Sequence, residues 1–425
     1  MKSLASSLIV LSLLVVSAAA QSAPTDLERS RGRTMLNAVK NDLKRNYYDP
    51  TFRGIDIDAR FKQAEERIKN APSLNHIFGI IAETLVELND SHTFFLPPRR
   101  SYTFDYGWEM QMIGDKCYVI AVKPGSDADT KGLKAGDEIY TIDNIGPIRE
   151  NFWKLQYLYY ALTPRTRIHL NVIKPDGKQQ EFDVETTIVQ GKPVMETGAY
   201  AELLERRHKM DRQIRHRFHE TDDVVIWKML AFDLAPNDVD NMAGRAKNRK
   251  AVILDLRGNG GGDEETLLRL IANFFDRDIK LGDIRRRKET RPLVAKTRAG
   301  NAFTGKLIVL IDSESGSAAE LFARVVQLEK RGVVIGDVSS GAVMRSQRYS
   351  HTVGVGTVIF YGVTITDADI VMADGKSLEH VGVTPDELKL PTPKELAAKH
   401  DPVLAYAASL AGVTMTPEKA GTLFQ

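Results

Sequence analysis

The stretch IDSESGSAAELF, residues 311–322, places three serines and one glycine between an apolar run and an amphipathic run. The apolar residues 307–311 are typical of a short buried strand, and the residues after Ser317 repeat apolar side chains at helical spacing. A serine at the start of a helix lies beside unpaired N–H groups and the positive end of the helix dipole. The sequence therefore makes Ser317 a candidate nucleophile, with the Ala318 N–H beside it to stabilise an oxyanion.

The same residues also fit a purely structural role. Ser317 and Glu320 form the S-x-x-E pattern of a capping box, in which the serine only satisfies the end of the helix. Ser313 and Ser315 are alternative nucleophiles in the same turn. A second motif is needed to choose between these interpretations.

That motif is AVILDLRGNGGGDE, residues 251–264, a strand that ends in consecutive glycines. Such glycines allow positive φ angles and expose backbone N–H groups. A nest of this kind binds an anion, either the oxyanion of acyl transfer or a phosphate. No G-K-[ST] follows, which excludes a P-loop. A plain turn remains an alternative.

Composition limits the function classes. The 425 residues are 43% hydrophobic, enough for two or three domains, and 58 basic residues face 56 acidic ones. This balance argues against a nucleic-acid partner, and we expect the basic run RRRK, residues 285–288, to be a solvated loop. The single cysteine, Cys117, excludes an internal disulfide and a cysteine-based metal site. We predict neither a metal nor a cofactor.

The first 20 residues resemble an export signal. Lys2 precedes an apolar stretch, and Ala18 and Ala20 fit the small-residue rule for cleavage. The stretch is shorter than the roughly 20 residues that a membrane span needs. We expect cleavage after Ala20 and a periplasmic or secreted protein with no other transmembrane segment; an uncleaved anchor is the alternative.

The pattern of the remaining chain predicts a multidomain α+β protein. Residues 24–100 have helical periodicity, and residues 101–190 have the alternation of a β-rich module with one helix. The charged residues 191–223 are expected to be a helical or irregular connector. Residues 224–390 alternate strand and helix signals, which indicates an α/β core, and residues 391–425 form a helical tail.

Together these motifs resemble the S41 family of serine peptidases, which includes the C-terminal processing (tail-specific) proteases and the catalytic core of tricorn protease. The resemblance runs from about residue 30 to 412 and is carried by these segments: LNDSHTFF (88–95), KPGSDADTKGLKAGDEIYTID (123–143), DLRGNGGG (255–262), SGSAAELFARVVQ (315–327), VVIGDVSSGAV (333–343) and LEHVGVTPD (378–386). It implies an N-terminal helical region, a PDZ-like module and a catalytic core of the ClpP/crotonase-like α/β type.

The resemblance implies Ser317 as the nucleophile. The oxyanion hole would use the N–H groups of Ala318 and of Gly261 or Gly260. In the processing-protease branch a lysine follows the glycine that aligns with Gly341. This sequence has Ala342 there, and no lysine lies between positions 330 and 376, so the serine–lysine pair of that branch is missing.

The tricorn-like branch offers a different base. By resemblance, His92 takes the serine proton, and Glu379 assists it through Ser91. The alternatives remain open: His92 capping the helix end beside Asp90, or Glu379 acting as an ion-pair partner of Arg257. His351 and His380 are further candidate bases.

The PDZ-like module is expected to capture an extended peptide on a sheet edge. Its carboxylate-binding loop is predicted at Tyr106, Gly107 and Trp108, with a purely structural Trp108 as the alternative. In the resembled family such modules bind C-terminal tails and can gate access to the active site.

The resulting hypothesis is an exported serine endopeptidase that acts on protein or peptide substrates. The main alternative is a catalytically inactive peptide-binding or scaffold protein on the same fold, since the lysine is gone. A module for apolar ligands is a further alternative. The sequence leaves oligomerisation open.

Overall fold

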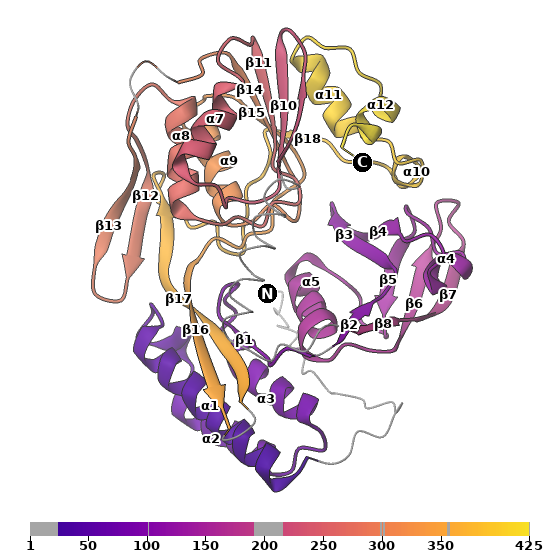
Figure 1. Cartoon of the computed structure of the whole chain (residues 1–425), viewed down its shortest axis with the longest axis vertical. Helices are drawn as coiled ribbons and strands as arrows, with labels where there is room; N and C mark the ends of the chain where they lie inside the picture. Colours follow the sequence, from indigo (N-terminus) through magenta and orange to yellow (C-terminus); the bar gives the residue numbers. More distant parts are fainter. Residues whose placement is uncertain are drawn as a thin grey trace, which may run out of the picture.

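The computed structural model describes residues 24–100, 102–190, 216–297, 300, 302–354 and 358–424. The predicted signal peptide, residues 1–20, and most of the predicted connector lie outside the described residues. Figure 1 shows a helical region, a β-rich module and an α/β core arranged around the middle of the view. The expected multidomain α+β architecture is confirmed.

The N-terminal region consists of three helices, α1 (Asp26–Asn46), α2 (Ile57–Lys69) and α3 (Leu74–Val86). Each begins after a residue whose side chain accepts a hydrogen bond from the first turn, namely Thr25, Asp56 and Ser73. Their apolar faces pack against one another and against strand β17 (Ile359–Met372). The helical region is therefore fastened to the C-terminal half of the chain.

The β-rich module is a five-stranded antiparallel sheet in the order β3-β4-β5-β6-β7. Its elements are β3 (Trp108–Ile113), β4 (Lys116–Val122), α4 (Asp127–Thr130), β5 (Glu138–Ile142), α5 (Arg149–Gln156), β6 (Arg167–Ile173) and β7 (Gln179–Glu185). A separate ribbon pairs β2 (Tyr102–Asp105) with β8 (Thr187–Gln190). Because β3 pairs only with β4 in this sheet, its other edge faces away from the module.

The core is a six-stranded sheet in the order β18-β15-β14-β11-β10-β9. Its strands are β9 (His216–Glu220), β10 (Val224–Met229), β11 (Ala251–Asp255), β14 (Lys306–Ile311), β15 (Val333–Gly336) and β18 (Glu387–Leu388), all parallel except β9. Residues 216–220 thus extend the sheet, whereas the sequence pattern predicts a helical or irregular connector there. These residues form a strand, despite their charged composition, because they pair with the buried strand β10.

Helices cover both faces of this sheet, as Figure 1 shows. One face packs against α7 (Pro236–Gly244), α8 (Glu264–Phe274) and α9 (Ala318–Leu328). The other packs against α11 (Pro402–Leu410) and, beside it, α12 (Pro417–Thr422). Alternate residues of each strand enter the two cores, as the two-residue period of a strand requires: Val225 and Trp227 on the first side, Val224 and Ile226 on the second.

A second sheet links the core to the helical region. It contains β1 (Phe94–Leu96), β12 (Ile279–Arg286), β13 (Thr290–Ala295), β16 (Arg345–Val353) and the 14-residue strand β17. One end of β17 pairs with β12, and the other pairs with β1 and β16. The segment that carries His92 is held in place by this sheet.

The sequence predicts that the basic run at residues 285–288 is a solvated loop, and the structure contradicts this prediction. Arg287 donates to the Lys44 carbonyl, and its guanidinium lies 5.8 Å from the centre of the Phe52 ring. Arg286 pairs with Glu289 across the turn between β12 and β13. The run therefore joins this hairpin to the helical region.

An ion-pair network fixes the C-terminal helices to the sheet. Arg257 donates to both carboxylate oxygens of Asp255 and to both of Asp401, at 2.7–2.9 Å. Asp401 also accepts from the Leu404 N–H as the cap of α11. Short helix α10 (Pro393–Ala397) precedes this cap. Within the described part of the chain, no helix combines the length and apolar character that crossing a membrane requires.

We predict that Asp401→Ala lowers the free energy of unfolding by about 2–3 kcal/mol, since it removes a helix cap and leaves a partly buried guanidinium with one carboxylate fewer. Thr416→Ala is the matched control, because Thr416 caps α12 without an ion pair; its cost should be about 1 kcal/mol. Urea unfolding measures both, and equal losses would contradict the structural role of the network.

Candidate active site

The glycine nest and Ser317 meet at the carboxyl ends of two adjacent parallel strands, β11 and β14. Gly261 has φ 95°, and a Cβ built on it would lie 2.6 Å from the Ser317 Cβ and 3.0 Å from the Ala318 nitrogen. Only glycine fits at this distance. The structure therefore brings together the two motifs that the sequence analysis singles out.

Ser317 has an uncommon backbone conformation, φ 51° and ψ −117°. Its N–H donates to the Ala342 carbonyl at 2.8 Å and to the Glu320 carboxylate at 2.9 Å. Of the predicted capping box, only the Glu320 half is formed, because the Ser317 side chain makes no cap hydrogen bond. A helix cap, however, normally has extended backbone angles, and a non-glycine residue at positive φ costs about 1–3 kcal/mol. Such strain is typical of functional turns rather than of simple caps.

The other two serines of the turn have structural partners. Ser313 donates to the Met112 carbonyl of the β-rich module. Ser315 is fully buried, and it donates to the Leu256 carbonyl and accepts from the Asp312 N–H. The partly buried Ser317 hydroxyl, in contrast, donates to no acceptor among the described hydrogen bonds. Of the three serines, Ser317 is the one whose proton is not already committed.

The proposed oxyanion donors differ in availability. The Gly261 N–H already donates to Asn259 Oδ1 at 2.8 Å, while Asn259 in turn is anchored to the Met229 carbonyl. Among the hydrogen bonds described, the N–H groups of Ala318 and Gly260 donate to no acceptor. The two groups that remain available are therefore Ala318 and Gly260.

Glu320 organises the turn around Ser317. Its side chain is fully buried, and it accepts hydrogen bonds from the following groups: the N–H groups of Ser317, Gly341 and Ala342 and the hydroxyls of Ser339 and Ser340. Burial raises the pKa of this carboxyl to about 7, against the opposing effect of its hydrogen bonds. Glu320 thus ties the start of α9 to residues 339–342, a role larger than the cap that the sequence pattern indicates.

A hydrogen-bonded relay connects Glu379 to His92. Ser91 donates its N–H and its hydroxyl to the Glu379 carboxylate, at 3.0 and 2.9 Å, and its Oγ lies 2.7 Å from His92 Nδ1. Glu379 also accepts from the Val343 N–H at 3.0 Å. Since Nδ1 is engaged, the Nε2 atom of His92 is the nitrogen left for a proton from elsewhere.

The relay and the nucleophile lie on either side of one short segment. The Ala342 carbonyl binds the Ser317 N–H, and the next residue, Val343, binds Glu379. The described hydrogen bonds include none between His92 and Ser317. The structure therefore brings the four predicted catalytic residues to one region without closing the last contact.

The environment keeps His92 neutral. Burial lowers the pKa of the imidazole, while the charges of Glu379 and Asp90 oppose that shift. The backbone N–H of His92 donates to Asp90 at 3.0 Å. Asp90 is buried and also accepts hydrogen bonds from the hydroxyls of Thr366 and Tyr47. Asp90 thus fixes the backbone of the turn, and a neutral imidazole is the form that can accept a proton.

The other candidate bases, and Arg257, have partners of their own in the structure. His351 pairs with Asp42 on the β16–β17 arm, and His380 binds the Asn89 carbonyl. Arg257 binds Asp255 and Asp401 rather than Glu379. Arg257 is therefore not the ion-pair partner of Glu379, whose carboxylate lies 3.5 Å from His380 Nε2.

Lys228, a lysine of the central sheet, has partners of its own and does not replace the missing one. Position 342 is alanine, and its N–H is held by Glu320. Lys228 on β10 donates to the Arg257 carbonyl at 2.8 Å and pairs with Asp255 at 3.2 Å. No cluster of three or more side chains suited to holding a metal ion is found among the described residues.

The predicted carboxylate-binding loop is well packed. Tyr106 and Trp108 are buried in the core of the β-rich module. The Gly107 N–H donates to Asp105, and a Cβ on Gly107 would lie 2.5 Å from the Ser126 Cβ. In this conformation Trp108 packs in the core of the module, as expected if its role is purely structural.

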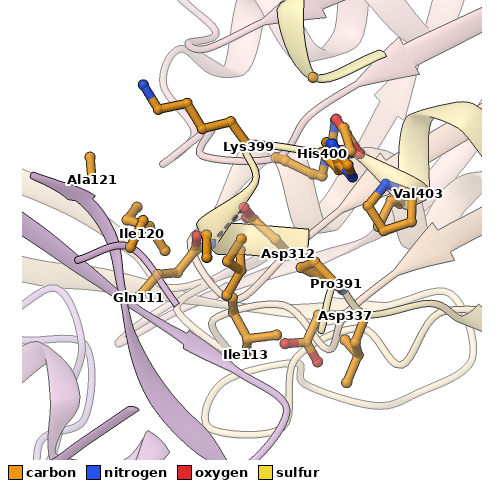
Figure 2. Close-up of a pocket in the computed structure, with 18 of the residues that line it drawn as sticks. Gln111, Ile113, Ile120, Ala121, Asp312, Asp337, Pro391, Lys399, His400 and Val403 are labelled. Carbon is orange, nitrogen blue, oxygen red and sulfur yellow. Dashed lines mark hydrogen bonds and ion pairs between the residues drawn. The ribbon is translucent and has the colours of Figure 1, made fainter. Parts of the chain in front are cut away.

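The β-rich module contacts the core beside the catalytic turn. Gln111 of β3 donates to Asp312, and Arg149 of α5 donates to Asp337 at 2.7 Å. A cavity of about 700 Å³ lies at this junction, lined by β3, β4, the ends of β14 and β15 and residues 389–403. Figure 2 shows Gln111 and Asp312 joined across it. Ser317 is not among the residues that line this cavity.

Comparison with known proteins places these features in a family. Residues 224–388 match the sequence profile of peptidase family S41, and residues 105–186 match that of the PDZ domain. Residues 224–388 are a domain of peptidase family S41. The resemblance stated from the motifs is thereby confirmed, including the PDZ domain ahead of the S41 domain.

Relatives with curated names are distant in sequence. Tricorn protease homolog 2 of Streptomyces coelicolor is 24% identical over 87% of this chain, and the tail-specific protease of Haemophilus influenzae is 25% identical over 59%. These alignments cover 31% and 36% of the relatives, so the chain spans about a third of their length. The structure of mature CPAF complexed with lactacystin has a TM-score of 0.65 at 15% identity and covers 91% of this chain and 98% of that one, which shows a shared fold.

We predict that Glu320→Gln lowers the free energy of unfolding by about 1–3 kcal/mol, because its amide N–H₂ would face groups that are themselves donors. Labelling of Ser317 by a fluorophosphonate should fall with it. Glu329→Gln, at the C-cap of the same helix, removes only an ion pair with the exposed Arg277; it should cost at most about 1 kcal/mol and leave the labelling unchanged. An unaltered urea midpoint for Glu320→Gln would contradict the organising role of this carboxylate.

Proposed function

We propose that the protein is a serine-type endopeptidase with Ser317 as nucleophile and His92 as general base. The observation that carries the proposal is the Glu379–Ser91–His92 relay, whose members lie 2.7–3.0 Å apart and whose carboxylate also binds the segment next to Ser317. The S41 domain supports the reaction class. The strained, uncommitted Ser317 supports the choice of nucleophile.

The proposed reaction is acyl transfer in two stages. His92 Nε2 takes the proton of Ser317 Oγ as this oxygen attacks the peptide carbonyl, and the imidazolium then returns the proton to the leaving amine. The N–H groups of Ala318 and of the glycine nest receive the oxyanion. Glu379 stabilises the imidazolium through Ser91: the Nδ1–H of His92 donates to the Ser91 hydroxyl, and this hydroxyl donates to the carboxylate. Water completes the cycle by hydrolysing the acyl-enzyme.

The PDZ domain is proposed to present the substrate. The outer edge of β3 offers backbone groups to which an extended peptide can add as a further strand. The same strand contacts Asp312 and Ser313, which immediately precede the catalytic turn. A peptide segment held on this edge would lie near Ser317. The proposed substrates are therefore proteins or peptides, including C-terminal tails.

Export belongs to the same proposal. The pattern of residues 1–20 supports a cleaved signal and a periplasmic or secreted enzyme. Mass spectrometry of the protein from the exporting host is expected to find an N-terminus at Gln21; an intact Met1 would contradict cleavage.

Labelling by an acylating probe tests the catalytic proposal against the scaffold alternative. A fluorophosphonate should modify the wild-type protein at Ser317 alone. Both Ser317→Ala and His92→Ala should lose labelling and peptide hydrolysis, by about 10³-fold or more, while keeping the wild-type unfolding midpoint. Folded wild-type protein that no serine-directed probe modifies would favour the scaffold.

The pH dependence of kcat/KM should report His92. Only the neutral imidazole accepts the serine proton, so activity is lost as pH falls through the pKa of His92, which burial lowers below 6.5. The Glu379 charge raises this pKa, so Glu379→Gln should move the acidic limb to lower pH besides reducing kcat. A limb at or above 6.5 in the wild type, or an upward shift in the variant, would contradict the assignment.

A further inference from the structure

A cluster of three arginines lies beside the catalytic turn. Arg345 begins strand β16, three residues after Ala342, whose carbonyl binds the Ser317 N–H. Glu264 begins helix α8, three residues after Gly261, which contacts Ser317. Since three residues span at most about 11 Å, both side chains start from the immediate surroundings of the nucleophile.

The cluster is formed by Arg286, Arg291 and Arg345 around two carboxylates, Glu264 and Asp367. Arg291 donates to Glu264 at 3.2 Å, whereas Arg286 lies 3.7 Å from Asp367. A further carboxylate, that of Glu289, pairs with Arg286 at the exposed turn of the hairpin. Near the nucleophile, three guanidiniums thus share two carboxylates.

Arg345 is the member whose donors are least used. Its nearest carboxylates are Glu264 at 3.9 Å and Asp367 at 3.8 Å, both beyond hydrogen-bond distance. Its Nη1 atom is buried and has no hydrogen-bond partner, and the same holds for Asp367 Oδ1 and Arg286 Nε. Buried polar groups nearly always have partners. The side chain as a whole is 25% exposed, so a ligand can approach the part of the guanidinium other than the buried Nη1.

We propose that Arg345 forms a subsite for a carboxylate of the peptide substrate, within about three residues of the scissile bond. A guanidinium binds a carboxylate through two parallel N–H···O bonds. On Arg345 these would come from Nε and Nη2, which donate no described hydrogen bond and lie away from the buried Nη1. An extended peptide advances about 3.3 Å per residue, so the distance from Ala342 to Arg345 corresponds to about three substrate residues. The inference rests on the proposed peptidase function and adds an acidic preference to it.

The carboxylate can come from an Asp or Glu side chain or from the free end of a tail. The two sources differ in one respect that peptides can test: amidation of the C-terminus removes the second and leaves the first. Glu264 competes for the same guanidinium, so its neutralisation should strengthen the subsite.

Binding to a Ser317→Ala protein tests the subsite without relying on turnover. Each fluorescent peptide carries one Glu, placed at a different position in each peptide, and is compared with the peptide that has Gln there. Every peptide is made with a free and with an amidated C-terminus. We expect at least one carboxylate to tighten binding about tenfold, the effect of one charge-assisted hydrogen-bonded pair. Arg345→Gln should abolish this difference, and Glu264→Gln should enlarge it.

Arg348→Gln is the matched control, since Arg348 lies on the same strand, is exposed and makes no described side-chain contact. It should leave the tenfold difference unchanged. Equal binding of acidic and neutral peptides, or a preference that survives Arg345→Gln, would overturn the subsite. Fluorophosphonate labelling of the wild type separates the two failures. A labelled wild type without an acidic preference overturns the subsite alone, whereas an unlabelled wild type overturns the peptidase assignment.

Discussion

The buried carboxylate of Glu320 is the constraint on which the site depends. It gathers donors from the first turn of α9 and from residues 339–342, and so sets the backbone of Ser317 at an angle that a serine does not adopt unaided. Removing such a group from water is costly and is offset only when its hydrogen bonds are made. The catalytic turn therefore has one well-defined form as long as this carboxylate is satisfied.

The turn that carries Ser317 also connects segments that are far apart in the sequence. Ala342 binds Ser317, and Val343 binds Glu379, whose carboxylate accepts from Ser91 and so joins the S41 domain to the Ser91–His92 turn. Strand β17 supports this arrangement because it pairs with both β12 and β1. Where the resembled processing proteases have a lysine, Ala342 contributes only its backbone: its carbonyl accepts from the Ser317 N–H, and its N–H donates to Glu320.

Much of this architecture is readable from the sequence, for physical reasons. Consecutive glycines after a strand and a serine before a helix predict a shared edge, because carboxyl ends of neighbouring parallel strands meet. The strand at 216–220 is missed because its charged residues form an edge whose pairing is decided by β10. The network of Arg257 with Asp401, and the use of the Gly261 N–H by Asn259, depend on distances that no local pattern encodes. The Arg345 cluster likewise joins residues from five separate elements.

The central claim is that His92 serves Ser317 directly. A structure of the protein bearing a phosphonate or boronate adduct on Ser317 tests it most closely. The account predicts His92 Nε2 within about 2.6–3.2 Å of an adduct oxygen, with a second oxygen on the Ala318 N–H and the Ser91–Glu379 hydrogen bonds retained. An adduct in which another side chain approaches this oxygen, or in which the imidazole stays out of reach, would contradict the account.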